Sequence, residues 1–216
     1  NDVDDFSADS ATGLLIRMKA SADGLVDFFW STAANPGFAA SRRITANYTG
    51  SGDAQTLYFP LSGDVNWDGQ TITNLRLDPS KLDGTDFEID MIVFSAGDAD
   101  EDGMPDSYES ANLLDALDST DVDTDADVDR SSNFDEYIAG TDPRNAADLF
   151  NIATLTRTTN HFELTVDGKA GRTYRLFRKL ELDEENWFEV DAVETLGSDS
   201  MVTLEDTSVF DKAFYR

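Results

Sequence analysis

Twelve residues in the middle of this 216-residue chain, Asp98 to Glu109, carry the most restrictive pattern in the sequence. Carboxylates stand at the first, third, fifth, ninth and twelfth places of the run, and a glycine stands at the sixth. A hard cation such as Ca²⁺ takes about six to eight oxygen ligands, so a short loop that binds it must offer an oxygen at almost every second residue. Carboxylates packed this closely repel one another unless a cation lies between them. The run therefore predicts a calcium-binding loop.

Each place in this loop has an expected role. Gly103 supplies the unusual backbone dihedrals of the turn, and the backbone carbonyl of Met104 fills the next ligand position. Asp106 is expected to act directly or through a water, and Glu109 to close the shell with both oxygens. The alternative is a solvated acidic linker. The predicted ligands are Asp98, Asp100, Asp102, Met104, Asp106 and Glu109.

A second acidic run predicts a second loop, from Asp125 to Glu136. Of the overlapping Asp-x-Asp registers, only the one that starts at Asp125 places an oxygen-bearing side chain at the ninth position and a carboxylate at the twelfth. Arg130 stands where glycine is expected, so we expect a strained backbone and a weaker or irregular site. The predicted ligands are Asp125, Asp127, Asp129, Ser131, Asn133 and Glu136, with Asp121, Asp123 and Asp142 as auxiliary ligands.

Both runs have the ligand spacing of EF-hand-type calcium loops. Together with the Y-I-A-G-T-D-P run from Tyr137 to Pro143, they resemble the thrombospondin type 3 and dockerin-like calcium repeats that join domains in secreted bacterial proteins. The resemblance covers about fifty residues. It implies calcium but no particular activity, because such repeats accompany lyases, sulfatases, glycosidases and adhesins alike.

The charge of the chain is concentrated in the same region. Residues 96–148 carry 17 acidic and 2 basic residues, so −15 of the net charge of −28 falls there. So acidic a surface argues against binding to nucleic acid, whose phosphates require Lys and Arg, and against binding to anionic membranes. The chain has no cysteine, which excludes disulfides, thiolate zinc sites and a cysteine nucleophile.

An extracellular setting is expected. Extracellular calcium modules bind at about 10⁻⁴ to 10⁻³ M, which suits a site outside the cytoplasm. No run approaches the roughly 18 apolar residues of a membrane span, so no membrane insertion is expected, and residues 1–10 lack signal-peptide character. The chain is expected to be a monomeric part of a longer, secreted, multidomain protein.

Short apolar runs separated by turn signals predict strands on both sides of the acidic region. They are expected at 13–20, 24–31, 38–48, 55–61, 71–78 and 85–95, and again at 151–157, 161–167, 173–180, 186–190, 201–204 and 213–215. Short helices are expected at 105–117 and around Phe134 to Ile138, the second ended by Gly140. The predicted fold class is mainly β: a jelly-roll-like β-sandwich over 1–96, a helical spacer with the calcium loops over 97–148, and a small C-terminal β-sandwich over 149–216.

The first sandwich carries candidate carbohydrate-binding residues. Aromatic rings stack on the apolar faces of sugars, while carboxylates and guanidinium groups hydrogen-bond their hydroxyls. The alternative is that Trp30 shares a core face with Val26 and Phe28, and that Arg76 and Asp90 form a cross-strand ion pair. The candidates are Trp30, Tyr48, Tyr58 and Trp67, with Asp27, Arg76 and Asp90.

The run from Trp67 to Pro79 and the run from Glu88 to Ile92 resemble carbohydrate-binding, galactose-binding-like sandwich modules that accompany catalytic domains in marine polysaccharide-degrading bacteria. The resemblance implies a polysaccharide partner but names no sugar. Sulfated or uronate polymers suit so acidic a chain only if Arg17, Arg42, Arg43 and Arg76 cluster, or if bound calcium bridges the charges.

Catalysis is not expected. His161 is the only histidine, no G-x-S-x-G elbow accompanies it, and each β unit is small for a cleft that holds a polymer. The predicted function is a non-catalytic, carbohydrate-binding accessory region of a secreted polysaccharide-degrading enzyme, rigidified by calcium. The alternatives are a structural or adhesive module that binds protein, and a small calcium-dependent lyase or hydrolase.

Overall fold

The computed structural model describes residues 5–79, 84–158, 161–208 and 212–216. The chain is mainly β, as predicted, and every strand pairing between its described residues is antiparallel. Its contacts divide it into two units, Asn1–Val122 and Asp123–Arg216. The expected division into three parts, with boundaries after residues 96 and 148, therefore differs from the observed one. One acidic loop belongs to each unit.

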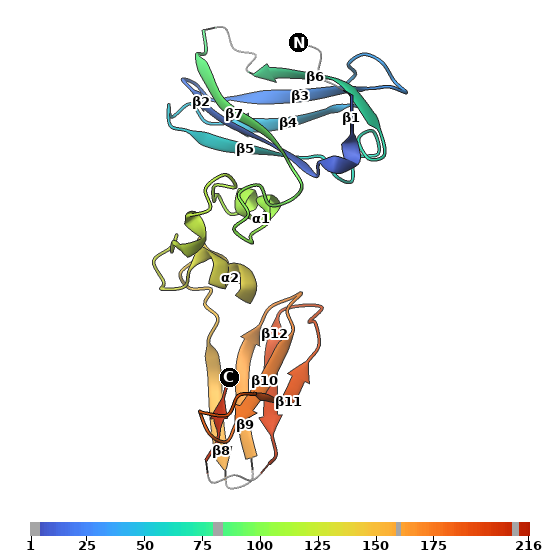
Figure 1. Cartoon of the computed structure of the whole chain (residues 1–216). Coiled ribbons are helices and arrows are strands. Elements are labelled where there is room, and N and C mark those ends of the chain that lie inside the picture. Colours follow the sequence, from blue (N-terminus) through green and yellow to red (C-terminus); the bar gives the residue numbers. More distant parts are fainter. Residues whose placement is uncertain (1–4, 80–83, 159–160, 209–211) are drawn as a thin grey trace. The chain divides into compact units, whose positions relative to one another are not determined.

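The first unit contains a sandwich of two sheets (Figure 1). In the four-stranded sheet the order is β1 (Phe6–Ser7), β6 (Thr71–Pro79), β3 (Gly24–Thr32) and β4 (Arg43–Tyr48). In the three-stranded sheet it is β5 (Gln55–Pro60), β2 (Gly13–Ala20) and β7 (Phe87–Ser95). A 3-10 turn, η1 (Ala8–Ser10), follows β1.

The two sheets enclose an aromatic core. Trp30 of β3 meets Trp67 edge to face, with ring centroids 5.4 Å apart, and both side chains are fully buried. The Trp30 indole donates to the carbonyl of Asn66, and the Trp67 indole donates to the carbonyls of Ala8 and Ala11. Tyr48 is buried in the same cluster. The expectation that Trp30, Tyr48 and Trp67 contact sugar is therefore wrong, because these rings supply the hydrophobic core and are out of reach of a ligand.

Several predicted boundaries move. β4 begins at Arg43 rather than Phe38, because Pro36 and Gly37 open a loop in which Gly37 has φ +87°. The helix expected at 105–117 is shorter: α1 spans Asp106–Ala111 and ends before Leu113, whose φ is +58°. A 3-10 turn, η2 (Asp121–Asp123), follows.

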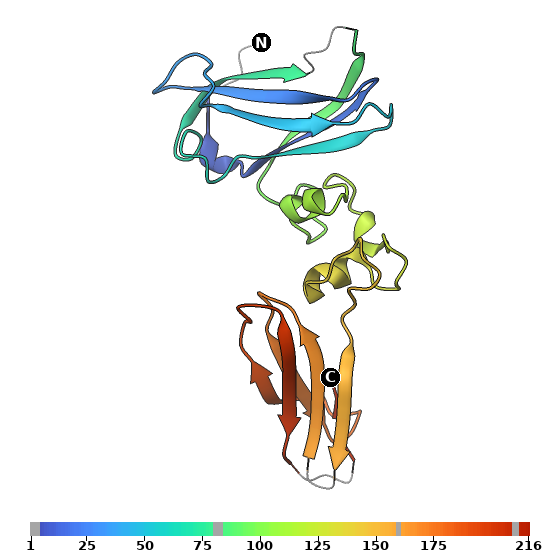
Figure 2. The ribbon, with the colours of Figure 1, turned by 180° about the vertical axis from the view of Figure 1, so that it is seen from behind.

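The second unit holds α2 (Asn133–Ala139) and a second sandwich, seen from both sides in Figures 1 and 2. One sheet has the order β12 (Ser200–Asp206), β9 (His161–Gly168) and β8 (Ile152–Thr158). The other has the order β11 (Phe188–Val193), β10 (Tyr174–Lys179) and β13 (Phe214–Tyr215). Val166, Leu176, Val202 and Leu204 form its buried core. None of the described helices is long and apolar enough to cross a membrane.

Candidate metal centres

The first acidic loop is braced by its own aspartates. Asp98 Oδ2 accepts from the backbone N–H of Gly103 at 3.1 Å, and Asp102 Oδ1 accepts from that of Met104 at 2.7 Å. Asp100 Oδ1 accepts from the N–H of Asp102 at 3.3 Å. Each aspartate therefore uses one oxygen to curl the backbone.

The second oxygens of the same side chains converge. Asp98 Oδ1, Asp100 Oδ2 and Asp102 Oδ2 are buried and accept no hydrogen bond, and neither do the two oxygens of Glu109. The carboxylates of Asp98, Asp100 and Asp102 lie within 4.8 Å of one another. Buried polar atoms in folded proteins normally have a partner, so five such oxygens around one centre fit a cation.

Asp121 completes this group. Its carboxylate lies within 4.8 Å of those of Asp102 and Glu109, and its Oδ2 accepts from the N–H of Asp115 at 2.7 Å. The sequence suggested Asp121 only as an auxiliary ligand of the second loop, so this assignment is corrected. Asp123 and Asp142 join none of the acidic groups among the described residues.

Asp106 was predicted to act as a ligand directly or through a water. Its side chain is buried; Oδ1 accepts from the N–H of Ala99 at 2.8 Å and Oδ2 accepts from the Ser95 hydroxyl. Asp106 therefore holds the loop to the end of β7, and its predicted role as a ligand stays a prediction.

The second loop repeats the same backbone path. Asp125 Oδ2 accepts from the N–H of Arg130 at 2.8 Å, as Asp98 does from Gly103. Asp129 Oδ1 accepts from the N–H of Ser131 at 2.7 Å. The carboxylates of Asp125, Asp127 and Asp129 lie within 4.8 Å of one another, and their register is the one predicted from Asp125.

The fourth and sixth places of both loops have positive φ. The values are +61° for Glu101 and +97° for Gly103 in the first loop, and +68° for Val128 and +88° for Arg130 in the second. Arg130 therefore adopts the glycine-like conformation, at a cost typical of non-glycine residues there. The predicted strain is present, but the loop keeps its shape.

The end of the second loop is also buried. Both oxygens of Asp127, Asp129 Oδ2 and Glu136 Oε2 are buried without a hydrogen-bond donor. Asn133 is buried and donates through Nδ2 to the Thr124 hydroxyl at 3.0 Å, and its backbone N–H donates to the Thr124 carbonyl at 2.8 Å. The roles predicted for Ser131 and for the carbonyl of Met104 stay predictions, because only their N–H groups are placed in the loop.

The carboxylates raise one another's pKa values. Burial, followed by repulsion from Asp100, Asp102 and Asp121, raises the pKa of Glu109 to about 9. Burial raises the pKa of Glu136 to about 7; a hydrogen bond from Thr141 opposes the shift, and Asp127 and Asp129 add to it. A cation placed in either group removes this repulsion. The all-oxygen donor sets fit a hard cation such as Ca²⁺ and offer nothing to a soft one.

Each loop is attached to the sandwich of its own unit. In the first unit, Asp115 pairs with Arg17 at 3.2 Å and accepts from the Thr56 hydroxyl at 2.6 Å on the outer face of the three-stranded sheet. In the second unit, Arg172 donates to the carbonyl of Tyr137, and Lys169 pairs with Asp148.

Comparisons with known proteins give no family for this chain. No known protein-family profile matches the sequence, and neither does any curated protein. A solved structure, the glycoside hydrolase domain of Endo-D from Streptococcus pneumoniae, aligns at 14% identity with a TM-score of 0.32. The alignment covers 94% of this chain but 25% of that one, so this chain spans a quarter of its length. A TM-score this low carries no argument about fold or activity.

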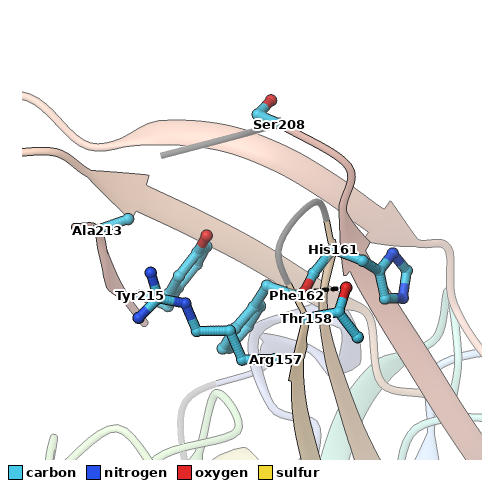
Figure 3. Close-up of a pocket in the computed structure, with 7 residues that line it drawn as sticks. All are labelled: Arg157, Thr158, His161, Phe162, Ser208, Ala213 and Tyr215. Carbon is cyan, nitrogen blue, oxygen red and sulfur yellow. Dashed lines mark hydrogen bonds between the residues drawn. The ribbon is translucent and has the colours of Figure 1, made fainter. Parts of the chain in front are cut away.

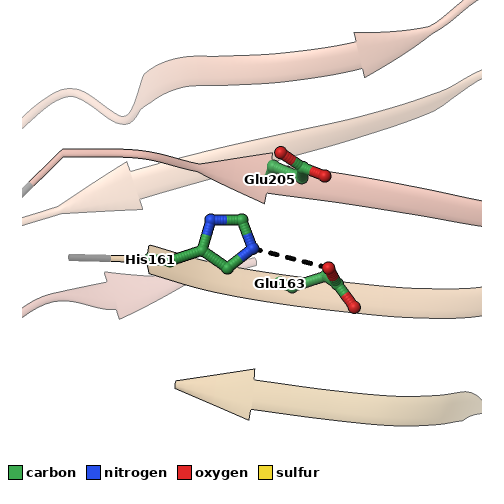
Figure 4. Close-up of side chains that lie close together, drawn as sticks. All are labelled: His161, Glu163 and Glu205. Carbon is green, nitrogen blue, oxygen red and sulfur yellow. Dashed lines mark hydrogen bonds and ion pairs between the residues drawn. The ribbon is translucent and has the colours of Figure 1, made fainter. Parts of the chain in front are cut away.

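A further acidic group lies on the outer face of the second sandwich (Figure 4). Glu163 of β9 is directly opposite Glu205 of β12, and His161 Nε2 lies 3.4 Å from Glu163 Oε2. All three side chains are at least partly exposed. They form a surface group with one His161–Glu163 contact rather than a loop with buried, unpartnered oxygens.

The predicted carbohydrate-binding residues do not form one site. Asp27 is buried, accepts from Thr45 and pairs with Arg43 at 3.5 Å. Arg76 and Asp90 lie in different sheets, so the suggested ion pair between them is wrong, and Arg76 pairs with Asp78 at 2.9 Å instead.

Tyr58 is half-buried on the outer face of the other sheet. Phe29 and Phe38 were not among the residues predicted from the sequence, and their rings lie 4.2 Å and 5.0 Å from the Arg76 guanidinium. Phe29 alternates with the core residues Phe28 and Trp30, and this alternation was the available signal.

Proposed function

We propose that this chain is a non-catalytic accessory region that binds two calcium ions, one in each unit. The observation that supports this most directly is the pair of buried carboxylate groups whose free oxygens converge within loops of the same backbone shape. Calcium bound there supplies charge compensation and therefore folding free energy.

Metal-dependent stability tests this proposal. For a dissociation constant of about 10⁻⁴ M, 10 mM Ca²⁺ stabilises each unit by about 2.7 kcal/mol. We expect two unfolding transitions, both at higher temperature with Ca²⁺ than with a chelator, and much smaller shifts with Mg²⁺. Transitions that do not respond to calcium would contradict the proposal.

Single substitutions assign the ions to the loops. Glu109→Gln should abolish the calcium shift of the first unit alone, and Glu136→Gln that of the second, because each removes a buried carboxylate that closes a shell. Glu101→Gln is the control, since Glu101 lies in the first loop but is exposed. Equal behaviour of Glu101→Gln and Glu109→Gln would count against the assignment.

The two proposed sites lie close together in the sequence. Asp121 belongs to the first group and Asp125 to the second, so three residues separate them. Of these, Asp123 ends the 3-10 turn η2, and Thr124 accepts from the backbone N–H of Asn133 in the second loop at 2.8 Å. This arrangement suits an extracellular accessory region that connects other domains, where calcium is abundant.

Carbohydrate binding is a second candidate function, supported by the outer face of the four-stranded sheet. Phe38 is 39% exposed there, and Arg76 lies over both the Phe29 and Phe38 rings. Arg43 lies 5.8 Å from the Phe29 ring, so two guanidinium groups flank the aromatic pair. An exposed ring beside hydrogen-bond donors suits a sugar and favours anionic polysaccharides.

Affinity electrophoresis against sulfated, uronate and neutral polysaccharides tests this surface. Retardation should be lost in Phe38→Ala and kept in Phe87→Ala, because Phe87 is similarly exposed on β7 of the other sheet. Equal retardation of both variants, or none of the wild type, would contradict this second function. New reducing ends or unsaturated products would contradict a non-catalytic role.

A further inference from the structure

The turn that follows α1 is anchored on the outer face of the three-stranded sheet. Arg17 of β2 and Thr56 of β5 are direct cross-strand neighbours on that face. Both contact the carboxylate of Asp115: the Thr56 hydroxyl donates to Oδ1 at 2.6 Å, and the Arg17 guanidinium lies 3.2 Å from Oδ2. One side chain of the turn is therefore fixed by two strands at once.

The backbone of the same residue contacts the first carboxylate group. The Asp115 N–H donates to Asp121 Oδ2 at 2.7 Å, and the Asp121 carboxylate lies within 4.8 Å of those of Asp102 and Glu109. Asp115 thus lies between the sheet and a proposed calcium ligand. A short chain of polar contacts leads from the sheet to the carboxylate group, and all of its members belong to the first unit.

The turn is also tied to the carboxylate group where it begins. α1 ends at Ala111, and the N–H of Leu114 donates to the carbonyl of Glu109 at 2.8 Å. Leu113 has a left-handed φ of +58°, which turns the chain back at this point. Residues 110–120 therefore connect Glu109 and Asp121, two carboxylates of one group, and the sheet holds the middle of this segment.

The sheet beneath this turn is shielded from water. Leu15 of β2 lies two residues before Arg17 and so faces the same, outer side, yet it is fully buried. Its cross-strand neighbour Tyr58 is half-buried, and burial, followed by the charge of Asp106, raises the pKa of the Tyr58 hydroxyl. α1 packs against β5 (Figure 1). The acidic loop and its turn therefore cover this part of the outer face.

We propose that Arg17 and Thr56 are positioning residues of the first calcium site, which they orient through Asp115 and Asp121. The inference rests on the proposed function, calcium binding by the first loop. A ligand that is already held in place loses less conformational freedom on binding, so fixing Asp121 raises the affinity. Coupling between two equilibria is reciprocal. The occupied site would therefore hold the turn on the sheet and keep Leu15 covered.

The second unit attaches its loop in a different way. Arg172 donates to the carbonyl of Tyr137 in α2, and Lys169 pairs with Asp148. Neither acceptor is part of an acidic group among the described residues. A cavity of 210 Å³ opens where β8 ends and β9 begins (Figure 3), and none of its described lining residues comes from the second loop. The coupling is therefore expected at the first site.

The opposite sheet of the first unit offers a matched control. Asp27 of β3 accepts from the hydroxyl of its cross-strand neighbour Thr45, and Arg43 lies 3.5 Å from the same carboxylate. Asp27 thus has the same two kinds of partner as Asp115. It alternates with core residues of β3 and so lies on the outer face of the four-stranded sheet. Thr45→Val therefore removes a comparable hydrogen bond on the other side of the sandwich.

Calorimetric titration with Ca²⁺ in the Glu136→Gln background measures the first site. Thr56→Val keeps the charge and nearly the shape of the side chain. It should weaken binding about fivefold or more, because a hydrogen bond to a charged group is lost. Thr56→Ser keeps the hydroxyl and Thr45→Val acts elsewhere, so both should bind within about twofold of the background protein. Thermal unfolding of each variant checks that it folds.

Arg17→Gln separates the position of this residue from its charge. Loss of a positive charge near the site by itself favours a cation, whereas loss of the contact with Asp115 weakens binding. We expect weaker binding than in the Glu136→Gln background protein. Equal or tighter binding would show that Arg17 acts by its charge alone and would overturn its positioning role.

The amide of Asp115 gives a second readout. Hydrogen exchange measured by NMR should show that calcium protects this N–H in the background protein and in Thr45→Val, and protects it less in Thr56→Val. Affinity that is unchanged in Thr56→Val, or lost equally in Thr45→Val, would overturn the inference and leave calcium binding intact. No calcium binding by the Glu136→Gln protein would overturn the inference together with the proposed function.

Discussion

The two oxygens of the loop aspartates have different surroundings. In the first loop, one oxygen each of Asp98 and Asp102 accepts a backbone N–H, and the other is buried without a donor. The backbone of the loop is therefore shaped by the same side chains that we propose as calcium ligands. These backbone hydrogen bonds explain how the loop keeps a defined geometry even though burial and neighbouring carboxylates raise the pKa of Glu109 to about 9.

Arg130 is the residue of the second loop whose replacement is expected to raise calcium affinity. Its φ of +88° suits glycine, and the left-handed region costs other residues about 1 to 2 kcal/mol. Arg130→Gly also removes a cation from the loop. We expect calcium affinity of the second site to rise about tenfold in a calorimetric titration of the Glu109→Gln background. Unchanged or weaker affinity would show that Arg130 is not strained.

Asp121 offers a sharp test of the first site. Asp121→Asn should weaken calcium binding by the first unit about tenfold or more, because it removes a charge from the group with Asp102 and Glu109. Asp123→Asn, two residues later and exposed, is the control and should change the affinity little. Equal losses in the two variants would indicate a general charge effect rather than ligation.

Individual residues show how far the sequence alone could be interpreted. The register of both loops followed from spacing, because a twelve-residue loop fixes where oxygens must stand. Asp121 could not be assigned, since its approach to Glu109 depends on the turn after α1. For Asp106, the spacing predicted a ligand but could not show that its two oxygens accept hydrogen bonds from Ser95 and Ala99. From the sequence alone, Trp30 and Trp67 could belong either to the core or to a sugar site, and their burial in the structure assigns them to the core.

At the level of elements, both helices start at the ninth place of an acidic loop and are short. α1 has 6 residues and α2 has 7, well below the length of about 12 to 15 at which isolated helices become even marginally stable in water. Glu109 of α1 belongs to the first carboxylate group, and Glu136 of α2 is buried where the charges of Asp127 and Asp129 act on it. The stability of the helices is therefore expected to depend on the loops. The sequence pattern predicted a longer first helix, at 105–117, and did not indicate this dependence.

Gly140 fixes the end of α2. Its φ is +81°, and a Cβ there would lie 3.0 Å from Arg172 Nε. Gly140→Ala should destabilise the second unit by the left-handed strain of about 1 to 2 kcal/mol plus the cost of displacing Arg172 from Tyr137. Gly171→Ala is the matched control, with φ +76° and open space around it. In denaturant unfolding, Gly140→Ala should lose more stability than Gly171→Ala. Equal losses would show that the close approach of Arg172 to Gly140 does not affect stability.

Asp206 ties β12 to β10 and β13 and predicts a pH dependence. Burial raises the pKa of its carboxyl, but hydrogen bonds from Ser208 and Arg178 prevail and lower it. A group with a lowered pKa stabilises the fold above its unfolded value, about 3.9, and this stability is lost as the pH falls through the folded value. The free energy of unfolding of the second unit, measured with denaturant, should fall below about pH 4. Asp206→Asn should make this fall with pH less steep. A steeper slope in the variant would contradict this assignment.

At the level of the whole molecule, the acidic region is not a separate third part but is shared between two units. Composition showed where the charge lies, and it could not show that Asp115 attaches the first loop to Arg17 while Arg172 attaches the second to its own sandwich. These contacts join residues far apart in the sequence, which local patterns do not encode. Each unit therefore carries one of the two acidic loops that we propose as calcium sites.

Native mass spectrometry of the full chain counts the calcium ions that it binds. After chelation and return to millimolar calcium, we expect two tightly held calcium ions per chain, one in Glu109→Gln or Glu136→Gln, and none in the double variant. A wild-type chain that holds no calcium, or a double variant that still holds two ions, would contradict it.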